Sequence, residues 1–233
     1  MPGTNWQSLW LSADRSGSGN SLNRGSLVTS RPAARRSQSY IAIPSVPTMT
    51  DVPNSGFLGP NGLNQAASAF PLLTETGLAE PQGLTYTTPP LTHDLVSAGP
   101  AALDLRLSST ALETSIWAVI ADVRPDGSSH SIATGRLSSA YPNIIASRSL
   151  TDSAGDVVQP YGDYAHKSDA LPLASRDYQI EFWPIGNRFK SGHRIRLVIL
   201  GTSAASLPSL LALDTVTLGG PHASRLLLPV LPG

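Results

Sequence analysis

The sequence predicts an all-β fold, an antiparallel β-sandwich of the jelly-roll type with few helices. Charged side chains make up only 14% of the 233 residues, well below the roughly 25% of an average soluble domain. The chain also contains 20 glycines and 20 prolines, residue types that favour turns. Several short segments alternate apolar and polar residues, which is the pattern of a strand with one buried face. Together these features favour many short strands joined by turns.

The N-terminal region is predicted to contain one short strand followed by a long loop. Residues 5–12 carry tryptophans and leucines and form the predicted strand, whereas residues 13–37 are rich in Ser, Gly, Asn and Arg without periodicity. Three arginines, Arg31, Arg35 and Arg36, cluster in this loop. Because no aromatic residues are interleaved with them and the net charge is zero, we interpret the cluster as a solvated loop rather than a nucleic-acid-binding patch.

A second stretch of irregular chain is expected before the main run of strands. A short strand is predicted over residues 39–43. Prolines and glycines then accumulate in residues 44–62, which we interpret as another long loop. Residues 64–70 are compatible with two helical turns.

The strand signal becomes stronger after these loops. Residues 84–88 are rich in β-forming side chains, and residues 101–107 alternate between leucine and charged residues, as a half-buried strand does. Residues 115–123 are almost entirely apolar, which predicts a central strand buried on both faces. The turn sequence at 124–127 and the apolar segment 132–137 that follows it predict a β-hairpin.

Four further strands are predicted towards the C-terminus. Residues 178–182 and 194–199 alternate between apolar and polar side chains, and residues 213–218 and 225–228 form the last two strands. We find no internal repeat and no boundary between domains, and therefore expect residues 1–233 to form a single β-sandwich domain.

Composition also excludes several classes of function. The 16 basic and 16 acidic residues balance, so no overall attraction to nucleic acid or to an anionic membrane is expected. The absence of cysteine excludes thiolate metal sites, cysteine nucleophiles and disulfides. No window approaches the roughly 18 apolar residues of a membrane span, and residues 1–6 do not resemble the start of a signal peptide. We therefore expect a cytoplasmic protein without nucleic-acid or membrane partners.

Candidate metal and cofactor sites are weak. The segment Gly17–Gly19 lacks the lysine of a phosphate-binding loop. Asp122 and Asp126 are better interpreted as turn residues than as calcium ligands, since a calcium cage needs about 6–8 oxygen ligands. We predict no cofactor and no metal. The histidines are scattered without metal-binding spacing, at positions His93, His130, His166, His193 and His222.

Three residues follow one another in the chain order of a catalytic triad. Ser203 follows an apolar strand, and Asp214 and His222 come after it, in the order of an α/β-hydrolase. The nucleophile of such enzymes requires a sharp strand-to-helix turn. The sequence Leu207-Pro208 leaves no room for that helix, and no βαβ pattern surrounds it. We interpret Ser203 as one of several polar serines at the end of a sandwich strand, and we predict no catalytic residue.

A series of motifs resembles the C-terminal domain of the X-Pro dipeptidyl-peptidase and CocE/NonD (cocaine esterase-like) serine hydrolases. The motifs follow the order of that family from residue 81 to residue 233, and residues 5–12 suit its first strand. Pro142 stands where the family usually has arginine, and residues 201–211 and 44–62 also depart from its pattern. The matching segments are residues 81–91, 99–110, 117–127, 135–141, 189–197 and 220–230.

The resemblance implies a jelly-roll, galactose-binding-like sandwich that packs on an α/β-hydrolase domain and a helical cap. The catalytic Ser, Asp and His of such enzymes lie in the hydrolase domain, which this sequence does not contain. The resemblance therefore implies an accessory or stabilising domain with an apolar docking face. Its partner would be an α/β-hydrolase domain or chain, or a second copy of this chain as a homodimer. The alternatives are a free-standing carbohydrate- or peptide-binding module, an independently active hydrolase, and a gene fragment without a function of its own.

Six further residues carry structural expectations of their own. Gly127 and Gly192 are expected to adopt positive φ in turns. His193 and Arg194 are interpreted as a pair at the start of a strand that satisfies buried backbone or carboxylate groups, rather than as functional residues. Trp117 and Trp183 are expected in the core rather than as ligand platforms.

Overall fold

The computed structural model describes residues 3–21, 23–42, 76, 80–168, 172–201 and 211–232. Within these residues the chain is nearly all β, with short 3-10 turns as the remaining regular elements, which confirms the predicted fold class. The predicted loop 44–62, the helical turns at 64–70 and Ser203 lie outside the described residues. None of the described helices is long and apolar enough to cross a membrane.

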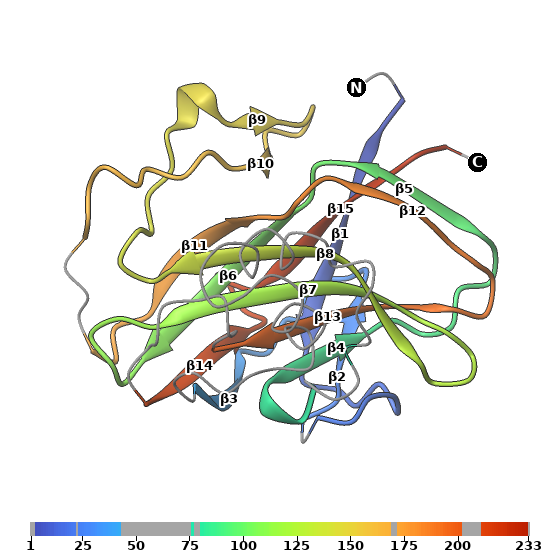
Figure 1. Ribbon diagram of the computed structural model, residues 1–233, viewed down its shortest axis with the longest axis horizontal. Coiled ribbons are helices and arrows are strands. Elements are labelled where there is room, and N and C mark those ends of the chain that lie inside the picture. Colours follow the sequence, from blue (N-terminus) through green and yellow to red (C-terminus); the bar gives the residue numbers. More distant parts are fainter. Residues whose placement is uncertain are drawn as a thin grey trace, which may run out of the picture.

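In the described part of the chain, the strands pair into one large sheet and two small ones (Figure 1). The large sheet has eleven strands, in the order β3-β14-β6-β15-β1-β2-β4-β13-β7-β8, with β11 pairing to β6. The small sheets pair β9 with β10 and β5 with β12. The strands are β1 (Asn5–Ser12), β2 (Gly25–Val28), β3 (Arg36–Ala42), β4 (Leu84–Thr87), β5 (Leu95–Gly99), β6 (Ala102–Ser109), β7 (Ser115–Val123), β8 (Ser129–Ser138), β9 (Leu150–Thr151), β10 (Val157–Gln159), β11 (Arg176–Glu181), β12 (Ile185–Phe189), β13 (Arg194–Leu200), β14 (Ala212–Leu218) and β15 (Arg225–Val230).

Strands that are distant in the sheet order share one core. Leu103 on β6 and Leu197 on β13 belong to the same cluster of buried side chains, together with Val216 on β14 and Ile120 on β7. The large sheet must therefore fold over on itself so that two layers face each other, which is the arrangement of a β-sandwich. The strands that pair are antiparallel except for β2 and β4, which run parallel.

The predicted burial patterns of β6 and β7 are both confirmed. On β6, the leucines face the core while Asp104 and Arg106 remain partly exposed. On β7, Ile116 and Ile120 lie in the main core, and Trp117 and Val119 form a second cluster on the opposite face with β13. A strand buried on both faces carries few polar side chains, because each one would need a hydrogen-bond partner inside the protein. This explains the nearly continuous apolar sequence of β7.

The loop predicted over residues 13–37 needs correction, because this segment contains β2 and the first residues of β3. The apolar signal of β2 is only four residues long. It forms a strand because Leu27 is buried opposite Leu11 of β1. Gly25 also lets the backbone approach the ring of Tyr86, where a Cβ would lie 2.5 Å from a ring carbon. Tertiary packing therefore supplies what the local sequence lacks.

The predicted turn geometry is confirmed at both glycines. Gly127 has φ +89° in the β7–β8 hairpin, and Gly192 has φ +81° before β13. In the hairpin, the Arg124 amide donates to the Ser128 carbonyl at 2.9 Å. The Asp126 carboxylate accepts hydrogen bonds from the backbone amide and the hydroxyl of Ser128. Asp126 is thus a turn residue, as interpreted from the sequence.

Candidate functional site

The triad-like residues do not come together among the described residues. Asp214 is buried on β14, where its Oδ2 accepts a hydrogen bond of 2.7 Å from Thr114. His222 lies on the surface, with its Nδ1 3.5 Å from a carboxylate oxygen of Asp177. Ser203 lies outside the described residues. The aspartate and the histidine thus have different partners, which gives no support to a catalytic pair.

Asp214 is instead a buried carboxyl group within the core. Burial raises the pKa of Asp214, and hydrogen bonds with neighbouring hydroxyls oppose that shift only in part. The pKa of the adjacent Tyr40 is raised in turn, first by burial and then by the charge of Asp214. Such a group favours its neutral form, because a desolvated carboxylate is costly unless it is paired.

A second buried carboxylate, Glu80, lies in an ion pair that the sequence analysis missed. Glu80 and Arg196 are 0% and 2% exposed, and an Nη1–Oε1 hydrogen bond joins them. The other oxygen of Glu80 accepts from the Asn20 amide at 2.9 Å. Arg196 also donates to the hydroxyls of Thr87 and Ser18, at 2.9 and 2.7 Å. This network fastens the loop before β2 to β13, which is a structural role.

The histidine at the start of β13 also has a structural partner. His193 Nδ1 lies 2.9 Å from a carboxylate oxygen of Asp122 on β7, and both side chains are largely buried. The neighbouring Arg194 donates to the Thr88 carbonyl at 3.1 Å. These contacts confirm the interpretation of His193 as a residue that satisfies a carboxylate at a strand start. Within the described ranges, no group of three or more His, Asp or Glu side chains is placed to hold a metal ion.

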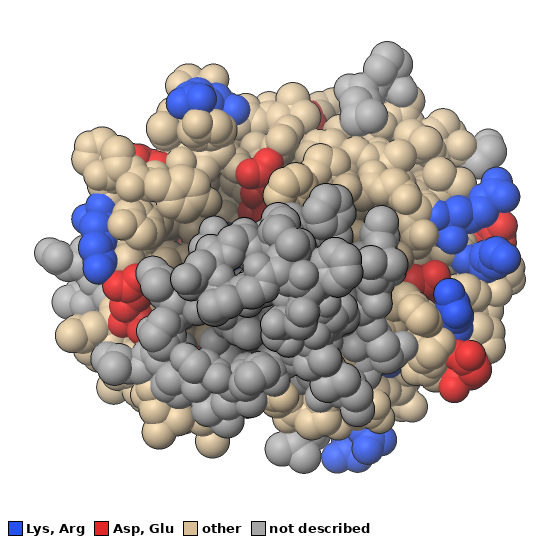
Figure 2. Space-filling model, viewed as in Figure 1, with Lys and Arg blue, Asp and Glu red and all other residues tan. Residues whose placement is uncertain are grey.

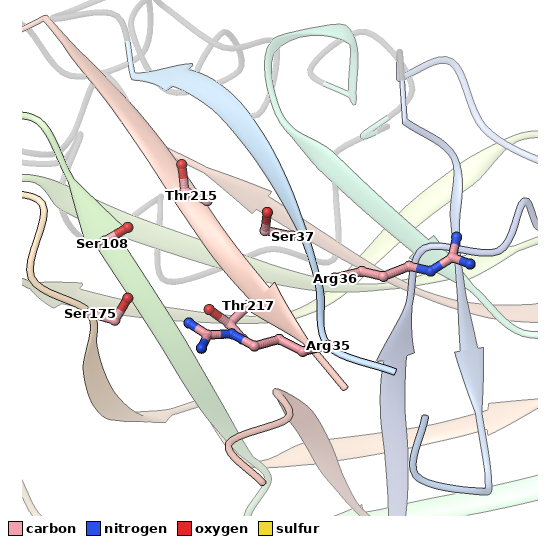
Figure 3. Close-up of a pocket in the computed structure, with 7 residues that line it drawn as sticks. All are labelled: Arg35, Arg36, Ser37, Ser108, Ser175, Thr215 and Thr217. Atoms are coloured by element: carbon pink, nitrogen blue, oxygen red, sulfur yellow. The ribbon is translucent and has the colours of Figure 1, made fainter. Parts of the chain in front are cut away.

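A polar pocket opens on the outer face of β3, β14 and β6 (Figure 3). Its volume is about 320 Å³, which lies at the lower end of the range for small-molecule sites. We call it the hydroxyl pocket, because five of its seven lining residues are serines or threonines. The lining residues are Arg35, Arg36, Ser37, Ser108, Ser175, Thr215 and Thr217.

Strand register explains why these hydroxyls meet. Ser37 on β3 pairs with Thr217 on β14, and Thr215 pairs with Ser108 on β6. Side chains at these positions point away from the core, since Val216 between the two threonines is buried in it. Residues that are far apart in the sequence thus form one hydroxyl-bearing surface. This surface could not be predicted from the sequence, because it depends on which strands pair.

A second surface is rich in exposed aromatic side chains. The Arg148 guanidinium stacks on the ring of Tyr161 at 3.7 Å from its centroid. Tyr164 is 63% exposed and Trp183 is 58% exposed. Burial raises the pKa of Tyr164, and the charge of Glu181, two residues before Trp183, raises it further. We call Arg148, Tyr161, Tyr164 and Trp183 the aromatic surface.

The expectation that both tryptophans are core residues is confirmed for Trp117 and wrong for Trp183. Trp117 is 2% exposed and packs with Val119 and Val198. Trp183 is exposed because it follows the buried Phe182, and successive side chains of an extended chain point to opposite faces. The alternation of residues 178–182 already placed position 183 on the outward face, and this signal could have predicted its exposure.

The segment that carries most of the aromatic surface is firmly attached to the sheet. It contains β9 and β10, which lie above β11 and β6 in Figure 1. Arg225 Nη2 donates to Asp156 at 2.6 Å, and its Nε donates to Asp104 on β6 at 2.8 Å. Val158 packs in a cluster with Ala102 and Leu227. The exposed aromatic rings are thus presented by a fixed scaffold.

The described surface carries few charges on the face shown in Figure 2. Lysine and arginine side chains, like those of aspartate and glutamate, are scattered mainly near its rim, with uncharged residues between them. This distribution agrees with the low fraction of charged residues, 14%.

Comparison with known proteins decides the family. Residues 1–218 match the X-Pro dipeptidyl-peptidase C-terminal non-catalytic domain. The chain belongs to this family. The resemblance stated from the sequence motifs is thereby confirmed. The description of this family is that of a C-terminal non-catalytic domain of X-Pro dipeptidyl-peptidases.

Two mycobacterial proteins are similar to the chain in sequence. They are named "Putative serine esterase Mb1866c", from Mycobacterium bovis, and "Putative serine esterase MT1883", from Mycobacterium tuberculosis. Each is 33% identical over 156 residues, which cover 64% of this chain and 24% of the relative. The match thus spans about a quarter of the length of these relatives.

Solved structures of hydrolases share the fold. A CocE/NonD family hydrolase from Staphylococcus aureus matches with a TM-score of 0.68 and 14% identity, over 100% of this chain and 37% of that chain. An aminopeptidase from a marine sediment archaeon, Thaumarchaeota archaeon, matches with a TM-score of 0.69 and 14% identity, over 98% of this chain and 37% of that one. An α-amino acid ester hydrolase gives a TM-score of 0.67 with 16% identity, over 97% and 36% of the respective chains. Because the sequence identities are 14–16%, these matches show a shared fold and carry no further conclusion.

Proposed function

We propose that this chain is an accessory domain that docks on, and stabilises, the α/β-hydrolase catalytic domain of a serine esterase or peptidase. The observation that carries the proposal is the match of almost the whole chain to a non-catalytic domain, while it covers only 37% of the hydrolases that share its fold. The separate partners of Asp214 and His222 support it. The substrate would then be bound and cleaved by the partner domain.

Pairing between the two ends of the chain supports a further part of the proposal, that residues 1–233 act as a single domain. The first strand, β1, pairs with the last strand, β15, with Asn5 opposite Val230. Strands from both ends therefore share one sheet and one core. A unit with this topology would dock as a whole.

The aromatic surface is the face that we assign to docking. Tyrosine, tryptophan and arginine are enriched at protein interfaces, where they supply most of the binding energy. Tyr164 and Trp183 expose large rings on a scaffold fixed by Arg225. The Arg148 guanidinium already lies over Tyr161, so its planar face is ordered before a partner arrives. An α/β-hydrolase domain is the occupant, because the fold occurs as one part of such hydrolases.

Complementation of a truncated relative tests the proposal. The M. bovis relative would be expressed without the region that this chain matches, and the chain would be added as a separate polypeptide. We expect the chain to form a one-to-one complex in analytical ultracentrifugation and to raise the melting temperature of the truncated esterase. Linked binding has this effect whenever a partner binds the folded state alone.

A pair of surface variants locates the interface. Trp183→Ser should weaken the complex by about tenfold or more, the loss typical of an interface hot spot. Leu112→Ser is the matched control, because Leu112 is also exposed but lies in the loop between β6 and β7, outside the aromatic surface. Equal losses for both variants would argue against the aromatic surface, and no complex with the unmodified chain would argue against docking itself.

The exposed rings also favour a second candidate, a free-standing module that binds carbohydrate or peptide. Sugar rings stack on exposed tryptophan and tyrosine side chains, and Trp183 and Tyr164 are available for such contacts. This candidate predicts binding of an oligosaccharide or peptide by the chain alone, with loss in Trp183→Ser and without any hydrolase. If the chain forms a homodimer when no hydrolase is present, a second copy of the chain would occupy the aromatic surface.

A further inference from the structure

The lining of the hydroxyl pocket carries positive charge and hydroxyl groups. Its lining combines the two arginines Arg35 and Arg36 with five hydroxyl-bearing side chains, and no aspartate or glutamate belongs to it. A guanidinium only donates hydrogen bonds, whereas hydroxyls both donate and accept them. A pocket with this lining favours a ligand that accepts hydrogen bonds and carries negative charge.

Most of these donors are not used within the described part of the chain. Arg35 and Arg36 form no ion pair with any described residue, whereas Arg106 on the same face is paired with Asp177. Thr215 shares a hydrogen bond of 2.8 Å with Ser39. Thr217 is 5% exposed and borders the pocket. Arg35, Arg36 and Ser37 are exposed, so their polar groups are available to a ligand that displaces water.

The hydroxyls of the three serines in the lining are free as well. Among the described residues, no hydrogen bond involves the side chain of Ser37, Ser108 or Ser175. They come from β3, from β6 and from the residue before β11. The donors therefore surround the pocket from three elements, instead of forming a row along one strand.

A double-glycine turn positions Arg35 at this pocket. Gly219 and Gly220 both have φ +68°, and the Gly220 amide donates to the Pro32 carbonyl at 3.0 Å. A Cβ on Gly219 would lie 2.2 Å from the Ala34 carbonyl oxygen. The close approach that glycine allows holds the residues before β3 against the end of β14. Arg35 therefore leaves the chain directly beside the pocket.

The two arginines point in different directions. In Figure 3 the Arg35 side chain extends across β14 towards Thr217 and Ser175, while the Arg36 side chain extends away from the hydroxyls. The strand pattern agrees, because Arg36 and Ser37 are consecutive residues of β3 and face opposite sides. The two side chains have the same charge and are adjacent in sequence, so they form a matched pair for an experiment.

We propose that the hydroxyl pocket binds the oxyanion group of a small polar ligand, with Arg35 as the charged anchor. The Arg35 guanidinium would donate to two oxygens of a phosphate or carboxylate, and Ser108, Ser175 and Thr217 would donate to the remaining lone pairs. The volume of about 320 Å³ exceeds that of the anion alone, which leaves room for a hydroxylated body. This inference does not rest on docking to a hydrolase.

A titration of the ¹⁵N-labelled full chain with inorganic phosphate tests the proposal. At constant ionic strength maintained with chloride, we expect saturable shifts of the backbone amide signals of Ser37, Ser108 and Thr217. Arg35→Gln should weaken binding by about tenfold or more, as expected when a charge-assisted hydrogen bond is lost. Arg36→Gln should change it by less than about threefold, because Arg36 borders the pocket but its side chain extends away from the hydroxyls, so its charge acts only through a screened field.

Three results would overturn the proposal. The first is the absence of saturable shifts with phosphate and also with acetate, which presents a carboxylate instead. The second is an equal loss in Arg35→Gln and Arg36→Gln, which would indicate a diffuse charge effect. The third is binding of neutral glucose at the same residues without any binding of phosphate. The melting temperature of Arg35→Gln should stay unchanged, because Arg35 is exposed, and an unchanged value excludes unfolding as the cause of lost binding.

Discussion

Charged side chains in the interior of the sandwich differ from Arg35 on its outer surface in whether an oppositely charged partner lies beside them. In the interior, Glu80 and Arg196 satisfy each other, and the donors left on Arg196 reach Thr87 and Ser18. On the outer face of β3 and β14, Arg35 lines a pocket without an acidic partner among the described residues. The charges of Glu80 and Arg196 thus hold strands and loops together, whereas the Arg35 guanidinium on the outer surface is available to contact other molecules.

The difference between paired and unpaired charges indicates which regions of the molecule are available to bind a ligand or partner. A buried ion pair contributes to folding only if every one of its polar atoms finds a partner. Its side chains are then unavailable for chemistry. Polar or aromatic groups remain available in the hydroxyl pocket and on the aromatic surface, and both regions lie outside the core.

The largest expected effect comes from breaking the interior pair. Glu80→Gln removes the negative charge and leaves Arg196 buried without a counter-charge, which typically costs about 3–5 kcal/mol. Urea unfolding should show this loss as a lower midpoint with an unchanged slope.

Glu113→Gln is the matched control for that variant. Glu113 also pairs with a cation, Lys167, at 2.8 Å, but both side chains are substantially exposed. Exposed pairs are worth only about 0–1 kcal/mol. Similar losses for the two variants would contradict the contrast between interior and surface.

A backbone effect of intermediate size is expected in the β7–β8 hairpin. Gly127 has φ +89°, a region that a β-branched residue adopts only with strain. Gly127→Val should therefore cost about 1–2 kcal/mol. No atom lies within 4 Å of the position of an added Cβ at Gly127 or at Gly186, and Gly186 does not have positive φ. Gly186→Val should be nearly neutral, so a melting temperature lowered equally by both would argue against backbone strain.

Asp214 should give a smaller effect that depends on pH. Burial raises the pKa of Asp214, so the folded state retains a proton that the unfolded state has already released. The contribution of this group to stability is therefore complete below about pH 4, the pKa of unfolded aspartate, and is lost as the pH rises through the folded pKa. Asp214→Asn removes this dependence while still accepting the hydrogen bond from Thr114.

The measurement is thermal unfolding of both proteins between pH 4 and pH 8. We expect Asp214→Asn to be at least as stable as the unmodified chain at pH 8, by on the order of 1 kcal/mol. The difference in melting temperature should shrink or reverse as the pH falls. Parallel curves over the whole range would show that Asp214 is already ionised at low pH in the folded state.

The smallest change in stability is expected on the aromatic surface. Trp183→Ser should alter the free energy of unfolding by less than about 0.5 kcal/mol, as exposed substitutions usually do. The same variant is expected to lose docking. A large loss of stability would instead place Trp183 in a structural role and would weaken the case for an interface.

The fold could largely be predicted from the sequence, because its strongest signals are local. Alternation in residues 101–107 and the apolar segment 115–123 correctly indicated β6 and β7. Strand β2 was missed, since its four residues form a strand only when Leu27 packs opposite Leu11. The pairing of β5 with β12 likewise depends on residues about ninety positions apart.

The candidate sites could not be predicted in the same way. Glu80 and Arg196 are 116 positions apart, and the sequence contains nothing that links them. The hydroxyl pocket depends on β14 lying between β3 and β6. Arg35 was interpreted as a solvated residue of a loop, and only the Gly219–Gly220 turn shows that it is held beside the pocket. Contacts of this kind require knowledge of strand order and register.

The most direct test of the central claim is labelling of the purified chain with an active-site fluorophosphonate probe, followed by intact mass spectrometry. Such probes react with serines that an adjacent base has activated. The non-catalytic assignment predicts that the chain remains unlabelled under conditions in which a complete serine hydrolase is fully modified. Stoichiometric labelling of Ser203 that disappears in His222→Ala would contradict it and would show that the chain carries a catalytic site of its own.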